Sequence, residues 1–361
     1  MIQSKRNCLM MAGVMMVASL TSCSQEKSVE ESADTQETMK IALVRDDASK
    51  KVDVLVDGKL FTAYIYPDTI AKPVLYPIQS AAGNSLTRGY PLDPRPGERV
   101  DHPHHIGHWF NFGDVNGLDF WNNSSAIPIE KRDKYGSVVH TGIQSVSESA
   151  NQAELAVTAD WKSPDGTILL KENTQFIFKA DSIKRVIERI TTLTAQDQEV
   201  KFTDNKEGMF AIRVARELEH PSDKPEIFTD ASGIATAVPT LNNEGVVGKY
   251  RSSEGLEGDA VWGTRGNWVN LTGEVKGEKV ALVIVDHPSN PGYPTYWHAR
   301  GYGLFAANTL GQKALSDGKD ELNLKLAPGE SVTFKYEILV YSDAQPDDST
   351  LKAEATSFGS R

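Results

Sequence analysis

The sequence predicts an all-β protein built as a large two-sheet β-sandwich. From about residue 41 to residue 342 it consists of short alternating or β-branched runs that are broken by turn residues. Two of these runs, Lys51–Val56 and Lys59–Ile65, flank Asp57-Gly58, a residue pair typical of a tight β-hairpin. No long stretch shows the 3.6-residue apolar spacing of an amphipathic helix. Because the composition does not change along this body, we expect a single domain over residues 41–345.

The other runs that predict strands follow in order along the chain. Trp109–Phe112 is expected to be a strand, and Pro164-Asp165-Gly166 marks a turn between two further runs. Residues 346–361 are set apart as a C-terminal tail. The remaining strands are expected at Ala153–Thr158, Thr167–Lys171, Gln175–Phe178, Lys184–Leu193, Val200–Thr203, Phe210–Val214, Lys279–Val285 and Ser331–Tyr341.

The first 40 residues predict a targeting signal and a tether rather than part of the fold. A short basic start precedes an apolar run, Leu9–Leu20, that is too short to span a bilayer as a helix. The run ends in Leu20-Thr21-Ser22-Cys23, which resembles the box at which bacterial lipoproteins are cleaved and lipidated. By that resemblance residues 1–22 are a signal peptide, Cys23 carries the lipid, and the polar, acidic residues 23–40 form a flexible tether. The alternative is an ordinary secreted signal in which Cys23 is incidental.

This interpretation predicts a cell-envelope lipoprotein, periplasmic or on the outer-membrane surface, that meets the membrane only through its lipid. Removing Lys5 and Arg6 with the signal changes the formal net charge from −11 to −13. An acidic body without a basic stretch is a poor partner for nucleic acid. Cys8 lies in the signal, so the mature chain has no disulfide, cysteine nucleophile or cysteine metal ligand. No apolar run of membrane-spanning length follows Cys23.

The first polar cluster is RVDHPHHIGHWFNFGDVNGLDFW, residues 99–121, which places four of the eight histidines within seven positions. Imidazoles near carboxylates serve acid–base chemistry close to neutral pH, and they also bind transition metals. The alternative is that these rings only pack and satisfy buried polar groups. We predict catalytic roles for His104 and His105, an alternative metal site that uses His102 and His104, and substrate binding by Arg99, Asp119 and Trp121.

The second cluster, residues 204–213, runs from a charged turn into an apolar strand. Glu207 at the start of that strand is the best acid–base candidate in this half of the chain. Arg213 alternates with Ala211 and should share its face, where a guanidinium needs a carboxylate partner or a substrate oxygen. We therefore predict that Glu207 is catalytic and that Arg213 binds substrate. The alternative is an exposed turn with a surface ion pair.

The third cluster, DHPSNPGYPTYWHARGYGLFAANTLG, covers residues 286–311 and is expected to be a long ordered loop. Its aromatic rings and its arginine suit a sugar, because rings stack on apolar sugar faces while polar groups bind the hydroxyls. A packed structural loop is the alternative. We predict that His298 is catalytic, and that substrate contacts come from His287, Asn290, Trp297, Arg300, Tyr302 and Asn308.

Taken in this order, the three clusters resemble the DUF6807 family, which also carries the label "methane oxygenase PmoA". The matching stretches are Asp101–Trp121, Lys206–Arg213 and His287–Gly311, so the resemblance covers essentially the whole mature body. The methane label does not suit this chain, because the membrane methane monooxygenase subunit of that name spans the bilayer several times. The resemblance implies a galactose-mutarotase-like supersandwich. It also implies a relation to proteins that are encoded beside carbohydrate-degradation genes in Bacteroidetes-like bacteria.

Three functions remain open from the sequence. The leading hypothesis is a carbohydrate-active enzyme of epimerase, lyase or hydrolase type that uses His/Glu acid–base chemistry on a sugar or oligosaccharide. The second is an enzyme whose histidine cluster holds a divalent transition metal. The third is a lipoprotein that binds glycans without turnover. The enzyme hypothesis requires that the three clusters meet in space.

Overall fold

Two eight-stranded antiparallel sheets form the framework of residues 39–361, the part of the chain that the computed structural model describes. We call them the first and the second sheet. In spatial order, the first sheet consists of β1 (Ile41–Asp46), β2 (Lys51–Val56), β3 (Lys59–Ile65), β4 (Val74–Ile78), β5 (His108–Phe112), β11 (Gly208–Arg213), β16 (Leu304–Asn308) and β15 (Tyr296–Arg300).

The second sheet contains the longest strands, and short elements connect the two sheets. In spatial order it consists of β12 (Lys249–Ser252), β13 (Trp268–Val275), β14 (Glu278–Asp286), β18 (Ser331–Ser342), β9 (Lys184–Ala195), β8 (Ile168–Ala180), β7 (Gln152–Lys162) and β6 (Ser137–Glu148). The other elements are the strand pair β10 (Val200–Lys201) and β17 (Lys325–Leu326), helices α1 (Gln312–Leu315) and α2 (Asp348–Gly359), and 3₁₀ turns at Ile129–Lys134, Arg216–Leu218 and Gly258–Val261.

The hairpin of β2 and β3 shows how the sequence produces these strands. Burial alternates along β2, so its valines enter the core while the residues between them are partly exposed. At the turn, Asp57 and Gly58 both have positive φ, at 48° and 76°. That backbone matches the twist of a two-residue hairpin, and Asp and Gly adopt it at low cost.

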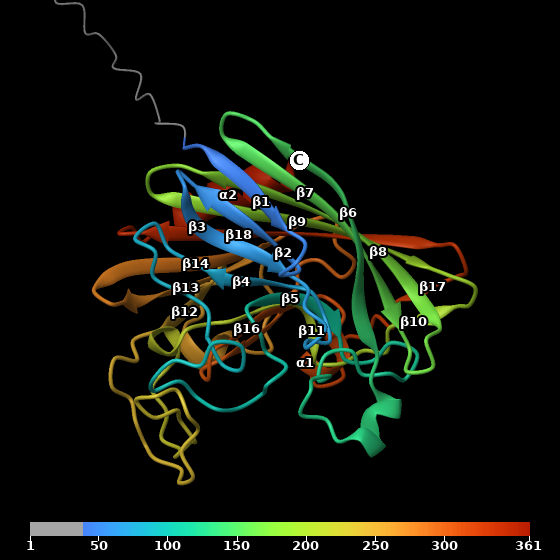
Figure 1. The fold of residues 1–361 in the computed structure, drawn as a ribbon, viewed down its shortest axis with the longest axis horizontal. Helices are drawn as coiled ribbons and strands as arrows, with labels where there is room; N and C mark the ends of the chain where they lie inside the picture. The colour runs from blue at the N-terminus through green and yellow to red at the C-terminus, as the bar shows by residue number, and fades with distance from the viewer. Residues whose placement is uncertain (1–38) are drawn as a thin grey trace, which may run out of the picture. The chain divides into compact units, whose positions relative to one another are not determined.

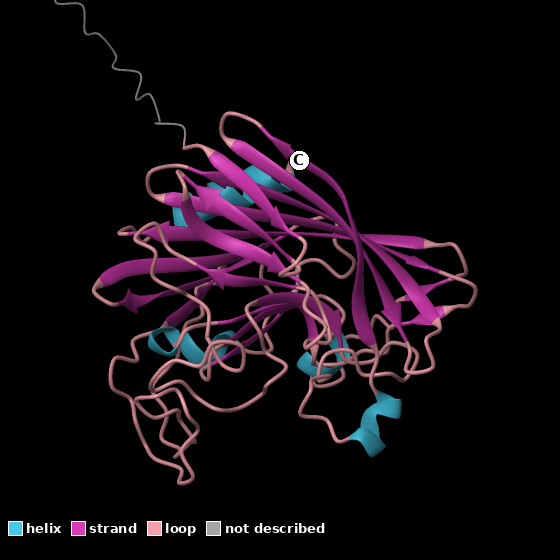
Figure 2. Ribbon diagram, in the orientation of Figure 1, coloured by secondary structure: helices cyan, strands magenta, loops and turns pink. Residues whose placement is uncertain are grey.

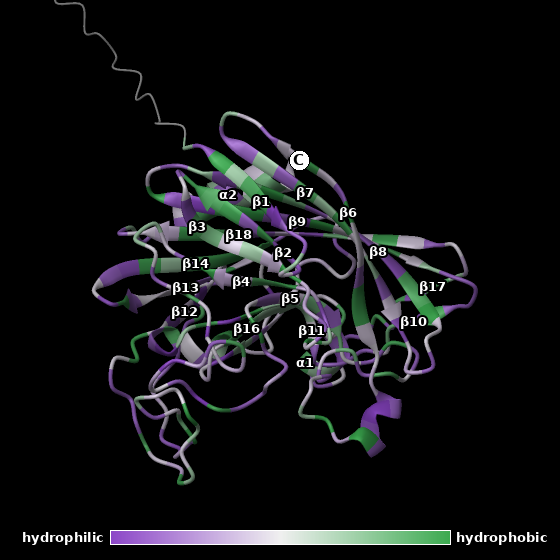
Figure 3. Ribbon diagram, in the orientation of Figure 1, coloured by the Kyte–Doolittle hydropathy of each residue, from purple (hydrophilic) through white to green (hydrophobic). Residues whose placement is uncertain are grey.

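The main hydrophobic core lies between the two sheets. It takes Phe110, Phe210 and Phe305 from the first sheet, and Phe176 and Ile338 from the second. Figure 1 shows β1, β2 and β3 lying across strands of the second sheet, and Figure 3 shows apolar residues concentrated on the strands. This burial of aromatic and aliphatic side chains is the dominant favourable term in the stability of the sandwich.

The outer faces of the two sheets are covered differently. On the second sheet, α2 buries Leu351, Ala355 and Phe358 in a small apolar cluster. This helix occupies most of residues 346–361, the segment set apart as a tail. On the first sheet, connecting segments cover a cluster that includes Trp109 and Trp121. Figure 2 shows how much of the molecule consists of such long loops, gathered along one side of the strands.

The all-β prediction is confirmed, and each strand expected from the sequence lies within or overlaps an observed one. The runs Thr167–Lys171 and Gln175–Phe178 belong to one strand, β8. The prediction of a long loop over residues 286–311 was wrong, because this segment contains the paired strands β15 and β16. No helix among residues 39–361 is long and apolar enough to cross a membrane. The predicted signal, Cys23 and nearly all of the tether lie outside the described residues.

Candidate active site

Four adjacent strands at one end of the first sheet bring residues from all three sequence clusters into one row. Trp109 on β5 is paired with Ala211 on β11, Ala211 with Ala306 on β16, and Ala306 with His298 on β15. Directly paired residues of an antiparallel sheet point to the same face. Their neighbours in sequence, such as Phe110, enter the core between the sheets. The row therefore lies on the outer face of the first sheet, where loops cover it.

The loop before β5 carries the histidines over this face. His102 has a positive φ of 41°, and the backbone N–H of His105 donates to its carbonyl, which closes a tight turn. Gly107 has φ 53°, and a Cβ there would lie 2.2 Å from the carbonyl oxygen of Leu75. Only glycine fits that approach. The carbonyl of Gly107 then accepts a hydrogen bond from the N–H of Arg213, which joins the loop to β11.

Four rings form a continuous stack in this place. His102 lies parallel to Tyr302 with 5.1 Å between ring centroids, and parallel to His105 at 4.8 Å. His105 in turn stacks on Trp109 at 5.0 Å. His104 and Trp121 meet His105 edge-on. We refer to the six rings, His102, His104, His105, Trp109, Trp121 and Tyr302, as the ring cluster.

Asp101 is the electrostatic centre of the ring cluster. Its carboxylate accepts hydrogen bonds from the guanidinium groups of Arg88 and Arg213, the second at 2.6 Å. Its other oxygen lies 2.9 Å from Nδ1 of His102. Burial disfavours the charge, but Arg213, the bond to His102 and Arg88 outweigh it and hold the pKa of Asp101 below its usual range. The carboxylate is thus ionised and orients His102. It is also the partner of Arg213, so the buried guanidinium that was predicted to bind substrate is bound by Asp101 instead.

Protonation of His104 and His105, which were predicted to be catalytic, is opposed by their surroundings. Burial, with the charge of Lys72, lowers the pKa of His104 to about 2. Burial, with His104 and Arg213, also lowers the pKa of His105 well below its ordinary value. Arg213 Nη1 donates to Nδ1 of His105 at 3.2 Å, so the remaining proton of that ring is on Nε2. Both rings are neutral at physiological pH, whereas the side chain of His102 is 42% exposed and paired with a carboxylate.

Lys72 is a site residue that the sequence did not reveal. It is 3% exposed, and its ammonium donates to the carbonyls of His104 and Trp121 beside the ring of Trp109. Burial lowers its pKa to about 7, with Asp119 opposing the shift. Lys72 stands alone between strands, outside any motif. Arg88 is a second residue of the site that the sequence did not reveal. A buried cation needs partners, but the sequence alone does not show which cations are buried.

Glu207 and His298 lie at the other side of the row. Glu207 begins the turn into β11, with its carboxylate 3.0 Å from Nζ of Lys206. His298 is bonded to the backbone of Lys206, and burial, Arg300 and Lys206 lower its pKa to about 3. Burial raises the pKa of Tyr302 to about 12, and the charge of Glu207 contributes to the rise. Glu207, His298 and the ring cluster therefore share one region, as the enzyme hypothesis requires.

Several buried polar atoms here have no partner within residues 39–361. Such atoms are costly in a folded protein, so a concentration of them indicates enclosed positions where ordered water or a bound group completes the hydrogen bonds. The unpartnered atoms of the site are Nε2 of His104 and His105, Nε1 of Trp109 and Trp121, Nε of Arg88 and Arg213, Nδ1 of His298, and Oδ1 of Asn111 and Asn308.

Two hollows adjoin the ring cluster. The larger, about 440 Å³, is lined by Tyr302 together with Arg99, His220, Trp262 and Arg300. The smaller, about 240 Å³, is lined by His104 and Lys72. The larger is of a size that holds a sugar. Tyr302 both stacks on His102 and lines this hollow, so it connects the space for a ligand with the Asp101–His102 pair.

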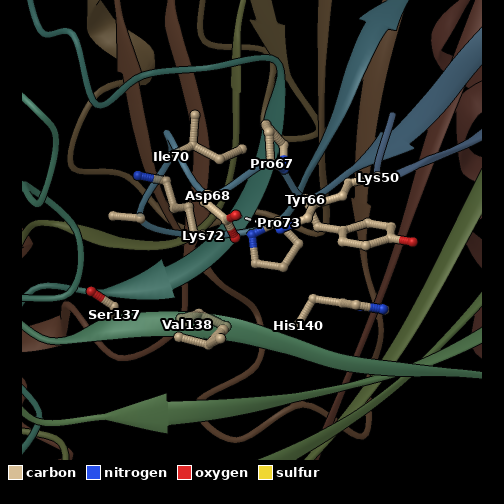
Figure 4. A pocket seen from close by; sticks show the side chains of 12 residues that line it. Lys50, Tyr66, Pro67, Asp68, Ile70, Lys72, Pro73, Ser137, Val138 and His140 are labelled. Carbon is tan, nitrogen blue, oxygen red and sulfur yellow. Dashed lines mark hydrogen bonds and ion pairs between the residues drawn. The ribbon is translucent and has the colours of Figure 1, made fainter. Parts of the chain in front are cut away.

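A further hollow lies on the opposite side of the segment that carries Lys72. It has a volume of about 450 Å³, and Figure 4 shows its lining, with Tyr66 and His140 side by side. Their rings stack at 3.9 Å, and Nδ1 of His140 is bonded to the hydroxyl of Tyr64 at 3.0 Å. The lining includes Lys72, but the ammonium of that residue is bonded to carbonyls of the ring cluster.

Three residues predicted to bind substrate have structural roles instead. Trp297 points into the core between the sheets and donates to the carbonyl of Gly266. His287 is bonded to Ser289 and to the carbonyl of Arg361, beside α2 of the second sheet. The side chain of Asn290 is hydrogen-bonded to Asp286 and to the backbone of Lys335. For these three the prediction was wrong, because they lie in the core or on the other sheet.

The remaining predicted contacts lie at the margins of the site. Arg99 lines the larger hollow but is bonded to Glu219 and Glu226. Asp119 accepts from the backbone and side-chain nitrogens of Asn122 in a turn. Asn308 lies on the outer face and donates to the carbonyls of Asn205 and Lys206. Arg300 and Tyr302 line the larger hollow as expected.

The metal hypothesis does not find its ligands. Within residues 39–361 no group of three histidine, aspartate or glutamate side chains is arranged to hold a metal ion. His102 and His105 stack face to face, which is not how two imidazoles share an ion. Asp101, the nearest carboxylate, is already bound by two arginines.

Comparison with known proteins places the chain in a family. A model of the family of unknown function DUF6807 matches residues 51–356. The chain belongs to the DUF6807 family. No curated protein matches the sequence of this DUF6807 chain.

Several solved structures resemble the DUF6807 chain at TM-scores below 0.5. They include the galactosidase domain of an α-galactosidase–sucrose kinase, AgaSK (TM-score 0.39, 8% identity, 83% of this chain). The chain spans only 41% of that structure. Others are the galactose 1-epimerase from Lactobacillus acidophilus NCFM (0.35, 10% identity, 84% of this chain and 99% of that one) and a galactose mutarotase-like protein from Clostridium acetobutylicum (0.31, 10%, 84% and 98%).

Proposed function

We propose that this DUF6807 protein is a carbohydrate-active enzyme in which His102, oriented by Asp101, moves a proton at a sugar. The observation that carries the proposal is the Asp101–His102 pair, placed beside the hollow that Tyr302 and Arg300 line. An imidazole whose Nδ1 is held by a carboxylate keeps Nε2 free as a base, and the carboxylate stabilises the imidazolium that forms.

The other residues of the site support this role in distinct ways. Glu207 is the second proton-transfer group, since its carboxylate lies on the same face of the sheet. The neutral rings of His105 and His298 offer buried nitrogen atoms without partners, which suit sugar hydroxyls. Trp109 and Trp121 add unpartnered indole N–H groups. Epimerisation, elimination and hydrolysis all need such a base and acid.

The proposal is tested with purified protein and a panel of reducing sugars, oxidised sugars and oligosaccharides. Mutarotation is followed by polarimetry, and elimination and hydrolysis by NMR. His102→Gln should lower the rate by about 10²- to 10⁴-fold, the usual contribution of a proton-transfer residue. The matched control is His287→Gln, the same substitution on the other sheet, which should keep the wild-type rate.

Asp101→Asn is a less direct test, because it also removes the counter-charge of two buried arginines and should destabilise the fold. A folded His102→Gln variant that keeps more than a tenth of the wild-type rate would contradict the assignment of His102. Sugar binding with no turnover by the wild-type protein would contradict the enzyme proposal and favour a glycan-binding role.

We also propose that the protein is anchored in the cell envelope through Cys23. Leu20-Thr21-Ser22-Cys23, outside the described residues, supports this proposal. Mass spectrometry of membrane-extracted protein should find a lipid-modified Cys23 at the mature N-terminus. Release of an unmodified chain, or membrane attachment of a Cys23→Ala variant, would contradict it.

A further inference from the structure

Arg300 presents an unpaired cation to the larger hollow. It ends β15, is exposed, and lies with Tyr302 in the lining of this space. Its guanidinium carbon lies 5.5 Å from the ring centroid of Trp262 and 5.8 Å from that of Tyr302. Contact with aromatic rings restrains the plane of a guanidinium and leaves its N–H groups free to bind an anion.

The arginines around Arg300 are arranged differently. Arg99 is bonded to Glu219 and Glu226, and Arg213 to Asp101. Arg216 is also bonded to Glu219. The side chain of Arg300 makes no hydrogen bond or ion pair with any residue of the described chain. A carboxylate is the usual partner of an arginine guanidinium, and Arg300 is the arginine in this group that lacks such a partner.

The other charged groups of the hollow leave Arg300 without a carboxylate partner. Glu226 is bound by Arg99 at 2.8 Å, and Asp259 lies 3.4 Å from Nδ1 of His220, whose pKa is lowered by burial. Asp223 and Lys224 are adjacent residues of opposite charge in the lining. The three cations Arg99, Lys224 and Arg300 therefore equal the three carboxylates in number, and Arg300 is the arginine of the lining that no carboxylate binds.

We propose that the larger hollow binds a sugar that carries a carboxylate, such as a uronic acid, and that Arg300 binds the carboxylate group. This inference rests on the proposed function in one respect: the ligand is taken to be a sugar because the same hollow adjoins His102. A planar carboxylate matches the fork of the guanidinium. Tyr302 stacks on His102 and also lines the hollow, so a sugar held there lies next to the base.

The test is calorimetric binding of galacturonate and glucuronate, each beside its neutral counterpart, galactose or glucose. The wild-type protein should bind the acids at least about tenfold more tightly than the neutral sugars, as a charge-assisted hydrogen bond predicts. Arg300→Gln should lose that preference and leave the weaker binding of the neutral sugars unchanged. Arg300→Lys, which keeps the charge but not the fork, should retain part of it.

Two controls separate this inference from the proposed function. Lys50→Gln removes a surface cation of the other hollow and should leave uronate binding unchanged. His102→Gln should abolish turnover but retain uronate binding, so a failure of the base assignment would leave the binding result intact. Equal affinity for acidic and neutral sugars, no binding of uronates, or full uronate binding by folded Arg300→Gln would each overturn the inference.

Discussion

Two buried polar regions of this molecule differ in how completely their hydrogen bonds are made. Between the sheets, Glu172 accepts from Trp161 at 2.8 Å, from Thr174 at 2.7 Å and from Arg189 at 2.8 Å. Arg189 also donates to Thr191 and lies over the rings of Phe110 and Phe176. We call this the inner network. In the ring cluster, by contrast, both indoles and two imidazoles leave a nitrogen unpartnered.

The difference separates buried polar groups whose hydrogen bonds are made within the fold from groups whose hydrogen bonds are left unmade. A network in which every polar group is hydrogen-bonded stabilises one arrangement of the core. Removal of one member leaves the others without a hydrogen-bond partner. An unsatisfied group costs stability in the free protein and is compensated when a ligand supplies the missing partner. Similar residue types thus have different consequences in the two regions.

The largest expected effect comes from breaking the inner network. Glu172→Ala leaves the guanidinium of Arg189 buried without its carboxylate and should lower the free energy of unfolding by about 3–5 kcal/mol. Urea denaturation followed by circular dichroism measures the loss. Glu172→Gln, which keeps the shape and an acceptor, is the control and should lose less. A loss below about 1 kcal/mol for Glu172→Ala would mean that the network contributes little.

A matched pair of substitutions compares the two regions directly. Trp161→Phe and Trp121→Phe remove the same atoms from fully buried positions. The first breaks the bond to Glu172, whereas the second removes an N–H without a partner. Trp161→Phe should therefore cost about 1–3 kcal/mol more in unfolding free energy than Trp121→Phe. Equal losses of stability for the two variants would contradict the comparison.

The smallest expected effect is a pH dependence of the free energy of unfolding that His104 in the ring cluster causes. The pKa of His104 is lowered from 6.5 to about 2, mainly by burial, so below pH 6.5 the unfolded chain takes up a proton that the folded chain refuses. This lowers stability as the pH falls and has no effect well above pH 6.5. Between pH 6.5 and 5.5 the contribution is about 1 kcal/mol.

His104→Gln should flatten the fall in the urea midpoint over this interval. Lys50→Gln is the control, because lysine does not titrate there when exposed, and should keep the wild-type slope. Identical slopes for His104→Gln and the wild type would show that folding does not lower the pKa of His104.

Much of the fold could be predicted because one face of most strands is buried and the other is not. β2 alternates in burial, and its hairpin turn has the residues that its backbone requires. β15 and β16 were missed because almost every residue of both strands is buried. Prolines and polar site residues in that segment then favoured a loop.

The site could be predicted in part for a similar reason. Dense polar motifs marked three segments that the first sheet brings together, and Glu207, Arg213, His298 and Tyr302 do lie near the histidines. Composition could not tell that burial would make His104 and His105 neutral and leave His102 the most exposed of the three, because that depends on the loop over the sheet. Nor could it separate Trp297 from His298, which point to opposite faces of β15.

The row formed by Trp109, Ala211, Ala306 and His298 has a consequence for how sequences of this kind can change. Each residue is contributed by a different strand, and side chains alternate faces at every step along a strand. Insertion of a single residue into β15 before Trp297 would turn the imidazole of His298 into the hydrophobic core and the indole of Trp297 outward. Natural insertions and deletions should therefore accumulate in the connections and be absent from β5, β11, β15 and β16.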